Sequence, residues 1–314
     1  MKLSIITINY NNVEGLRKTL ASVVAQTYRN IEHIIIDGGS IDGSVDVINA
    51  YESAIHSLNV HSFNVIWSSE PDMGIYNAMN HGIEIALGRR IVNTDHTTSS
   101  NSLNVNRSTL NELLCDYVQI LNSGDILAAP DVTERMVNAL HSFTRSTLND
   151  KIDVPILYGN MIKKDYTTGK ILGKSREVEY SLRQYYSSTM NHDCCYIRRD
   201  LFDTFGLYDE NLRIVSDWKW FLQAIGIGHV KPIYVDIDVT IFDASGISET
   251  NLSLRNQERR QVLEELLPPA ILADYDKYAF TTSQYDRLKK YHLWPLVYFI
   301  ERVLFKLNKW HILR

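Results

Sequence analysis

The chain has 314 residues, 45% of them hydrophobic and 22% charged, and its formal net charge is −5. This composition is typical of a folded globular protein, and it excludes a disordered chain and a disulfide-rich mini-protein. The acidic balance argues against nucleic acid as a partner. Three cysteines without metal-ligand spacing favour a reducing compartment, and no stretch reaches 18 apolar residues. We therefore expect a cytoplasmic chain with neither a signal peptide nor a membrane span.

The first 130 residues alternate short apolar runs with segments of helical periodicity. The expected strands are 3–8, 31–36, 64–67 and 117–121, and helical stripes fall at 16–24, 45–55 and 75–87. Alternation of this kind, with short loops, predicts a mostly parallel sheet flanked by helices. In such sheets ligands bind at the carboxyl ends of the strands, so polar residues at these ends are the first candidates for a site.

The rest of the chain is less regular. Strands are expected at 156–158, 171–172 and 229–241, and helices at 182–187, 216–225 and 252–267, the last of them stopped by Pro268-Pro269. Between Asn93 and Thr109, twelve of seventeen residues are Ser, Thr or Asn. This composition predicts a polar insertion that is either mobile or an ordered lid.

Polar side chains follow each of the four expected strands of the first half. They are Asn9 and Tyr10, Asp37, Glu70 and Asp72, and Asn122 and Asp125. A carboxylate such as Asp37 can accept an N–H from a nucleobase, Tyr10 can stack on that base, and Asp125 can hold a divalent cation. The alternative for each residue is a turn or a helix cap, because Asp and Asn side chains bond to nearby backbone.

Two nucleotide-binding motifs can be tested directly. The dinucleotide fingerprint requires three glycines after the first strand, but Ser40 stands between Gly38 and Gly43 and this loop follows the second strand. The phosphate-binding loop Gly-x-x-x-x-Gly-Lys-Ser/Thr does not occur in the sequence. The sequence therefore supports neither a dehydrogenase nor a P-loop enzyme.

An ordered series of short segments resembles one known family. The segments are SIITINYNN (4–12), QTY (26–28), IIDGGSIDGS (35–44), SEPDMGIYNAMN (69–80) and LNSGD (121–125), followed by a double arginine at 198–199 and SDW at 216–218. In this order they resemble the family-2 glycosyltransferases with the GT-A fold, most of all the branch that builds bacterial surface polysaccharides of the colanic acid, capsule or O-antigen type.

The resemblance implies a Rossmann-like α/β domain with a mostly parallel sheet and a C-terminal helical tail. Residues 1–130 would form the nucleotide-sugar-binding half, and residues 131–250 the acceptor-binding half that carries the catalytic base. Residues 251–314 would form a helical extension.

The resemblance also implies a nucleoside-diphosphate sugar donor, with a UDP-sugar favoured. Thr7, Asn9, Tyr10, Asp37 and Asp72 would surround its base and ribose. Asp125 matches the last residue of the family's Asp-x-Asp motif and would hold Mn²⁺ or Mg²⁺. Ser123 stands at the first acidic position of that motif, so Asn122 or the water shell of the ion would substitute there.

The reaction that the family carries out is an inverting transfer of the sugar to a hydroxyl of a glycan or a lipid-linked acceptor. Asp217 matches the general base, and its alternative role is the N-cap of the following helix. His192 could contact the donor diphosphate or the acceptor, or could be a structural hydrogen-bonding residue. The pair Arg198-Arg199 is either an anion site or the start of a solvated helix.

The last 30 residues differ in charge from the rest of the chain. Residues 285–314 carry a net charge of +5, and the remainder carries −10. One helical face carries Ile300, Val303, Leu304, Leu307 and His311. Another face carries the basic residues Arg302, Lys306 and Lys309, and the aromatic residues Trp294, Tyr298 and Trp310 flank the helix. This pattern favours a helix that lies in the interface of a membrane, at its cytoplasmic face. The alternative is a helix docked on the catalytic domain or on a second subunit.

Two further functions remain open at the level of sequence. One is a non-catalytic protein that binds nucleotide sugars or acts as a scaffold, since Ser123 replaces an acidic residue of the metal motif. The other is a nucleotidyltransferase, which would release diphosphate from a nucleoside triphosphate rather than a nucleoside diphosphate from a sugar donor.

Overall fold

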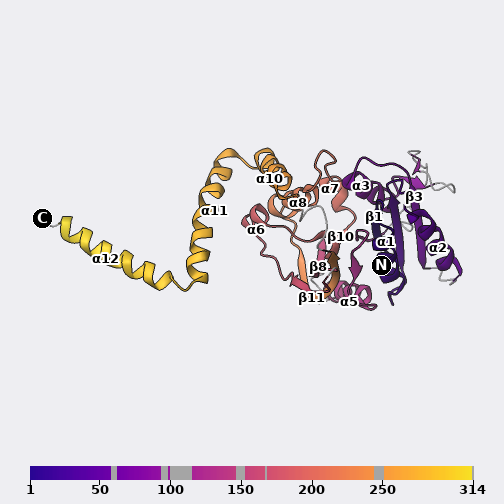
Figure 1. Cartoon of the computed structure of the whole chain (residues 1–314), viewed down its shortest axis with the longest axis horizontal. Coiled ribbons are helices and arrows are strands. Elements are labelled where there is room, and N and C mark those ends of the chain that lie inside the picture. Colours follow the sequence, from indigo (N-terminus) through magenta and orange to yellow (C-terminus); the bar gives the residue numbers. More distant parts are fainter. Residues whose placement is uncertain are drawn as a thin grey trace. The chain divides into compact units, whose positions relative to one another are not determined.

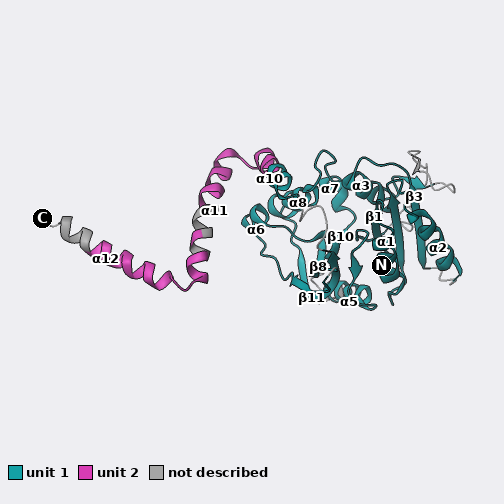
Figure 2. Cartoon of the chain, in the orientation of Figure 1, with its two compact units in different colours: residues 1–259 teal, residues 260–314 magenta. Residues whose placement is uncertain are grey.

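The structure is a computed structural model that describes residues 1–57, 62–92, 98–99, 115–145, 153–166, 168–243 and 251–312. The chain divides into two compact units, residues 1–259 and 260–314 (Figure 2). The insertion expected at Asn93–Thr109 lies outside the described residues, except for β5 (Thr98–Ser99), which pairs with β4 (Ile91–Val92). The three functional ranges expected from the sequence stay a prediction.

The first half of the main sheet is parallel, as the sequence predicts. It contains β1 (Leu3–Asn9), β2 (Ile31–Asp37), β3 (Phe63–Ser69) and β6 (Tyr117–Ile120) in the order β3-β2-β1-β6. Helices α1 (Val13–Val24), α2 (Ser44–Ser57) and α3 (Ile75–Ala86) connect and flank these strands (Figure 1). Every residue of β1 and β2 is buried, because helices cover both faces of the sheet.

The second half of the sheet is mixed. It continues through β10 (Cys195–Arg198), β8 (Ile156–Lys164), β11 (Ile233–Asp243) and β7 (Ile126–Leu127), and β9 (Ile171–Lys174) pairs with β8. Its helices are α5 (Val132–Arg145), α6 (Leu182–Ser187), α7 (Leu201–Phe205) and α8 (Ser216–Phe221), which continues into a π-helical turn at Leu222–Ile227. The sequence analysis did not predict β10 or β7.

The direction of β10 decides where the functional residues meet. This strand is antiparallel to both of its neighbours, β6 and β8, and β11 is parallel to β8. The start of β10 therefore lies at the same edge of the sheet as the ends of β1, β2, β6, β8 and β11. A short 3₁₀ turn, His192–Cys194, leads directly into β10 and so belongs to this edge.

Three helices end the chain. Helix α10 (Leu252–Leu266) crosses from the first unit into the second, and α11 (Pro269–Lys290) begins at the second proline of the predicted stop. The last helix is α12 (Trp294–Ile312). Among the residues that the structure describes, no helix combines the length and the apolar character needed to span a bilayer.

Candidate active site

A cavity of about 900 Å³ opens at the carboxyl ends of the parallel strands. Six residues expected to bind the donor or its metal line this cavity: Asn9, Tyr10, Asp72, Asn122, Ser123 and Asp125. We call it the donor cavity. Strand ends that are up to 116 residues apart in the chain thus place their polar side chains around one space, as the topology requires.

Glycine at position 38 shapes one wall of the donor cavity. A Cβ atom added to Gly38 would lie 2.6 Å from Asp72 Oδ2 and 3.1 Å from the Tyr10 ring. Asp72 is held in turn by the Gly74 amide, which donates to Oδ1 at 2.8 Å. The Tyr10 side chain is 66% exposed, so its ring is available for a ligand to stack on.

Asp37 lies behind the donor cavity instead of lining it. The residue is fully buried, and its Oδ1 accepts from Asn9 Nδ2 and Ser40 Oγ. Its Oδ2 accepts from the Ser40 amide and from Ser69 Oγ. Asp37 therefore fixes Asn9 and the loop after β2, and its expected contact with a base stays a prediction.

Thr7 is likewise buried and does not belong to the residues that line the cavity. Its hydroxyl lies 3.0 Å from His33 Nε2, and His33 Nδ1 lies 2.9 Å from the Tyr51 hydroxyl. Burial lowers the pKa of His33 to about 3, so this ring is neutral. The three side chains form a buried polar chain, and the expected contact of Thr7 with the nucleotide stays a prediction.

Asp125 has the environment expected of a carboxylate that holds a cation. It is almost fully buried, and Oδ1 accepts from the Asp243 amide at 3.0 Å. Burial raises its pKa well above the ordinary value, and the charge of Asp193 adds to this rise. A divalent cation would favour the ionised form of Asp125, so the residue fits such an ion.

The donor cavity is acidic throughout. Its charged residues are Asp72, Asp125 and Asp243, and no lysine or arginine is among the described residues that line it. The described residues also hold no group of three His, Cys, Asp or Glu side chains arranged as a complete metal site. Mg²⁺ typically takes only one or two protein carboxylates, and phosphate and water complete its shell.

A second cavity of about 320 Å³ contains both Asp217 and His192. We call it the Asp217 cavity. His192 Nδ1 lies 3.0 Å from Asp217 Oδ2, and the Tyr76 hydroxyl lies 2.9 Å from Asp217 Oδ1. Helix α8 begins at Ser216 and its N-cap is Val215, so the alternative role of Asp217 as the cap is wrong.

His192 connects the Asp217 cavity to the donor cavity. Its Nε2 lies 3.2 Å from the Asn122 side-chain nitrogen, whereas Asn122 Oδ1 is buried without a hydrogen-bond partner. If the side-chain nitrogen and oxygen of Asn122 exchange places, Asn122 Oδ1 accepts a hydrogen bond from His192 Nε2. Both groups are then satisfied, provided that the His192 ring is protonated. Asn122 lines the donor cavity, so one chain of hydrogen bonds links the two cavities.

Asp217 and His192 form an ion pair at neutral pH. Burial lowers the pKa of His192, but the hydrogen bond and the charge of Asp217 outweigh it and raise this pKa to about 9. Burial similarly raises the pKa of Asp217, but the hydrogen bonds of His192 and Tyr76 and the His192 charge outweigh it and lower this pKa. Asp217 is therefore an ionised carboxylate whose side chain is 17% exposed.

Tyr76 is the residue of this network that the sequence analysis missed. It is buried in the first turn of α3, and its hydroxyl also lies 2.6 Å from the Ile214 carbonyl oxygen. Burial and the charge of Asp217 raise its pKa well above 10, so it stays protonated. The segment that resembles the family contained Tyr76, but nothing in its spacing indicated a partner 141 residues away.

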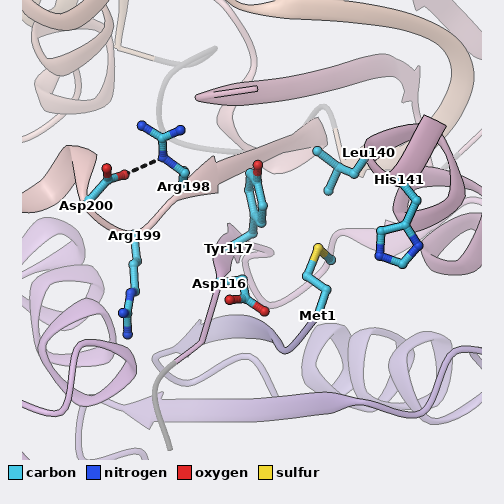
Figure 3. Close-up of a pocket in the computed structure, with 8 residues that line it drawn as sticks. All are labelled: Met1, Asp116, Tyr117, Leu140, His141, Arg198, Arg199 and Asp200. Atoms are coloured by element: carbon cyan, nitrogen blue, oxygen red, sulfur yellow. Dashed lines mark hydrogen bonds and ion pairs between the residues drawn. The ribbon is translucent and has the colours of Figure 1, made fainter. Parts of the chain in front are cut away.

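The two arginines at 198 and 199 lie at the opposite edge of the sheet. They line a separate cavity of about 470 Å³ with Met1 and Tyr117, which lie at the amino ends of β1 and β6 (Figure 3). Arg198 ends β10 and pairs with Asp200 and with Asp153. It is therefore not the start of a helix, and it plays no part in the donor cavity.

Comparison with known proteins agrees with this geometry. Residues 4–96 match the family model Glycosyl transferase family 2. The chain is 29% identical over 248 residues to "Uncharacterized glycosyltransferase Rv1514c" of Mycobacterium tuberculosis, which covers 78% of this chain and 76% of that protein. The predicted resemblance thus agrees with the match over residues 4–96, and the surface-polysaccharide branch stays a prediction.

Solved structures identify the architecture. S. aureus TarS 1–349 in complex with UDP-GlcNAc aligns with a TM-score of 0.56 at 16% identity, over 84% of this chain and 64% of that chain. The mannosyltransferase PcManGT from Pyrobaculum calidifontis, in complex with GDP-Man and Mn²⁺, aligns with a TM-score of 0.54 at 14% identity. The alignment covers 84% of this chain and 63% of that chain. The chain has the GT-A fold. It spans just under two thirds of either solved chain.

The Asp217–His192 pair predicts how stability depends on pH. A histidine whose pKa is raised from 6.5 to about 9 stabilises the fold fully below pH 6.5, and this contribution is lost as the pH rises to about 9. We expect the melting temperature of the wild type to fall over this interval more steeply than that of His192→Gln.

His56→Gln is the matched control, because His56 is exposed on α2. Its melting temperature should follow the wild-type curve. Equal slopes for the wild type and His192→Gln between these two pH values would contradict the ion pair.

Proposed function

We propose that the chain is an inverting, metal-dependent glycosyltransferase that moves a sugar from a UDP-sugar to a hydroxyl of a glycan or a lipid-linked acceptor, in the assembly of a surface polysaccharide. The observation that carries the proposal is the ionised carboxylate of Asp217, linked through His192 to Asn122 in the donor cavity. The family-2 match and the fold support a role in glycosyl transfer. The donor, the acceptor and the stereochemistry are our inference.

In this proposal the donor lies across the carboxyl ends of β1, β2 and β6. The exposed ring of Tyr10 stacks on the base, and Asn9 and Asp72 bind polar groups of the nucleoside. Asp37 acts from behind by fixing Asn9 with a hydrogen bond of 2.8 Å. The solved complexes of TarS with UDP-GlcNAc and of PcManGT with GDP-Man support a nucleotide sugar as the ligand class.

Asp125 would hold the divalent cation, with Asn122 and Ser123 on the same loop close to the diphosphate. When bound, the ion supplies the positive charge that a leaving diphosphate requires. Support comes from the lining of the donor cavity, which carries three carboxylates and no basic side chain among the described residues. The presence of Mn²⁺ in the PcManGT complex agrees with this assignment.

Asp217 would be the general base. The acceptor hydroxyl oxygen attacks the anomeric carbon, the bond from that carbon to the diphosphate oxygen breaks, and the hydroxyl proton passes to Asp217. Each carboxylate oxygen can accept two hydrogen bonds, so the contacts with Tyr76 and His192 leave room for the acceptor. His192 orients the carboxylate and, as a cation, keeps it ionised.

The alternatives differ from the proposal in what they do with Asp217. A non-catalytic binding or scaffold protein has no need for a partly exposed, ionised carboxylate beside the donor cavity. A nucleotidyltransferase would use the donor cavity for a nucleoside triphosphate and would require no acceptor cavity with a base. The geometry therefore favours the transferase.

Thermal shift with a nucleotide panel tests the donor class. We expect UDP and UDP-sugars to raise the melting temperature in the presence of Mn²⁺ and to do so less in its absence, because bound ligand stabilises the folded state. If only nucleotides with a base other than uracil raise the melting temperature, the proposed donor is wrong and that base identifies the donor. Stabilisation only by nucleoside triphosphates would favour the nucleotidyltransferase.

The variant Gly38→Ala tests whether the nucleotide binds beside Asp72 in the donor cavity. Its Cβ would displace the Asp72 carboxylate, the mobile end of a side chain, so the fold should tolerate it while the nucleotide-induced shift shrinks. Gly173→Ala is the control, since a Cβ there meets nothing within 4 Å.

Asp217→Asn tests the base. Donor binding should survive, and sugar transfer should fall by about 10²–10⁴ because the amide cannot accept the proton. Binding is measured by calorimetry and transfer by release of the nucleoside diphosphate. Full transfer activity in Asp217→Asn would exclude this residue as the base.

We also propose that α12 contacts an anionic membrane at its cytoplasmic face. Apolar side chains along the helix are exposed, among them Leu296, Phe299, Ile300, Leu304 and Phe305. At helical spacing, Arg302 and Lys306 share a face that lies opposite Ile300 and Leu304. Exposed apolar area combined with a basic face is the property of helices that lie in the interface.

Deletion of residues 293–314 should abolish binding to vesicles that contain anionic lipid, as measured by sedimentation. Arg302→Gln with Lys306→Gln should weaken binding at low salt and reduce its salt dependence, because two basic residues of the tail then no longer attract the anionic lipid. If the truncated chain still sediments with the vesicles as the full chain does, α12 is not the membrane contact and this proposal is wrong.

A further inference from the structure

The Asp217 cavity differs in charge from the donor cavity. Besides Asp217 and His192 it is lined by Lys163 of β8 and by Arg255 and Arg259 of α10. The second carboxylate of the cavity, Asp193, accepts a hydrogen bond from Thr240 Oγ1 at 2.5 Å. Basic side chains therefore gather where the acceptor would bind, whereas the cavity for the donor diphosphate is acidic.

Arg259 is held in place without a carboxylate partner. Its guanidinium stacks on the Trp218 ring at 4.4 Å and donates to the carbonyl oxygens of Ser187 and Ser188 at 3.3 and 2.9 Å. Within the described part of the chain, no acidic side chain forms an ion pair with it. Burial and the like charge of Arg255 lower the pKa of Arg259 to about 10, so it remains a cation at neutral pH.

The backbone that carries these arginines is anchored to the network of Asp217. Glu258 of α10 is buried and accepts from the Arg213 and Ile214 amides at 2.8 and 2.9 Å. The Ile214 carbonyl oxygen in turn lies 2.6 Å from the Tyr76 hydroxyl, which contacts Asp217. Arg255 and Arg259 are four residues apart, so they share a face of the helix and line the same cavity.

We propose that the Asp217 cavity binds an acceptor that carries an oxyanion, a phosphate or a carboxylate, next to the hydroxyl that receives the sugar. Arg259 and Arg255 are its ligands, because planar guanidinium groups bind such anions through paired N–H donors. The inference rests on the proposed function, since it names the class of acceptor for that same reaction. It makes the two arginines specificity-determining residues and leaves the chemistry to Asp217.

Calorimetry on the full chain tests this inference, with UDP and Mn²⁺ present to fill the donor cavity. The probes are inorganic phosphate, glucose 1-phosphate, glucuronate and the neutral methyl glucoside. We expect one of the anionic sugars to bind at least about tenfold more tightly than methyl glucoside, the effect of one charge-assisted pair. Comparing the affinities for glucose 1-phosphate and for glucuronate shows whether the cavity prefers a phosphate or a carboxylate.

Arg259→Gln should remove the preference for anions. Arg255→Gln should weaken it and provides a second variant if loss of the Ser187 and Ser188 contacts prevents folding. Arg260→Gln is the matched control, because its partly exposed side chain pairs with Glu264 and Asp276 and does not line the cavity. The control should keep the wild-type preference.

Equal binding of neutral and anionic probes, no binding of any anion, or anion binding that survives both variants would overturn the inference. Loss of UDP binding in Arg259→Gln would assign the arginine to the donor and also overturn it, while the proposed function stands. If the wild type binds no nucleotide, the proposed function fails. The anion titrations on the same chain without UDP then decide the oxyanion site by itself.

Discussion

The Asp217–His192 ion pair is the interaction on which the rest of the site depends. Both groups are largely withdrawn from water, and a buried charge that loses its partner is costly. Tyr76 holds the second carboxylate oxygen, and Asn122 lies at the far nitrogen of the ring. The position of the Asp217 carboxylate is therefore set by residues from α3, the loop after β6, the turn before β10 and α8.

The reversal of one strand makes this arrangement possible. Because β10 runs against its neighbours, the turn that precedes it reaches the edge where the parallel strands end. His192 can then meet Asn122, although 70 residues separate them in the chain. A fully parallel sheet would have placed that turn at the other edge, beside Met1 and Tyr117, where Arg198 and Arg199 now lie.

Sequence reasoning predicted the parallel half of the sheet, because its strands are apolar runs bounded by turn residues. It did not predict β10. It also expected Thr7 and Asp37 to contact the ligand, whereas Thr7 is enclosed with His33 and Asp37 accepts hydrogen bonds from donors of this chain. Burial of this kind depends on neighbours far along the chain, so local pattern could identify the edge of the sheet but not the direction of each side chain.

The Asp217–His192 ion pair acts on a carboxylate of each cavity. Burial and the charge of Asp193 raise the pKa of Asp125, and the charge of His192 opposes this rise while it lowers the pKa of Asp217. One imidazolium thus stabilises the ionised form of two carboxylates that line different cavities. Arg259 of the Asp217 cavity has no carboxylate partner among the described residues, and its guanidinium is held instead by the Trp218 ring and the carbonyl oxygens of Ser187 and Ser188. The donor cavity, in contrast, is lined by three carboxylates and by no basic side chain among the described residues. In our proposal, donor and acceptor would therefore be recognised through opposite charges at one edge of the sheet.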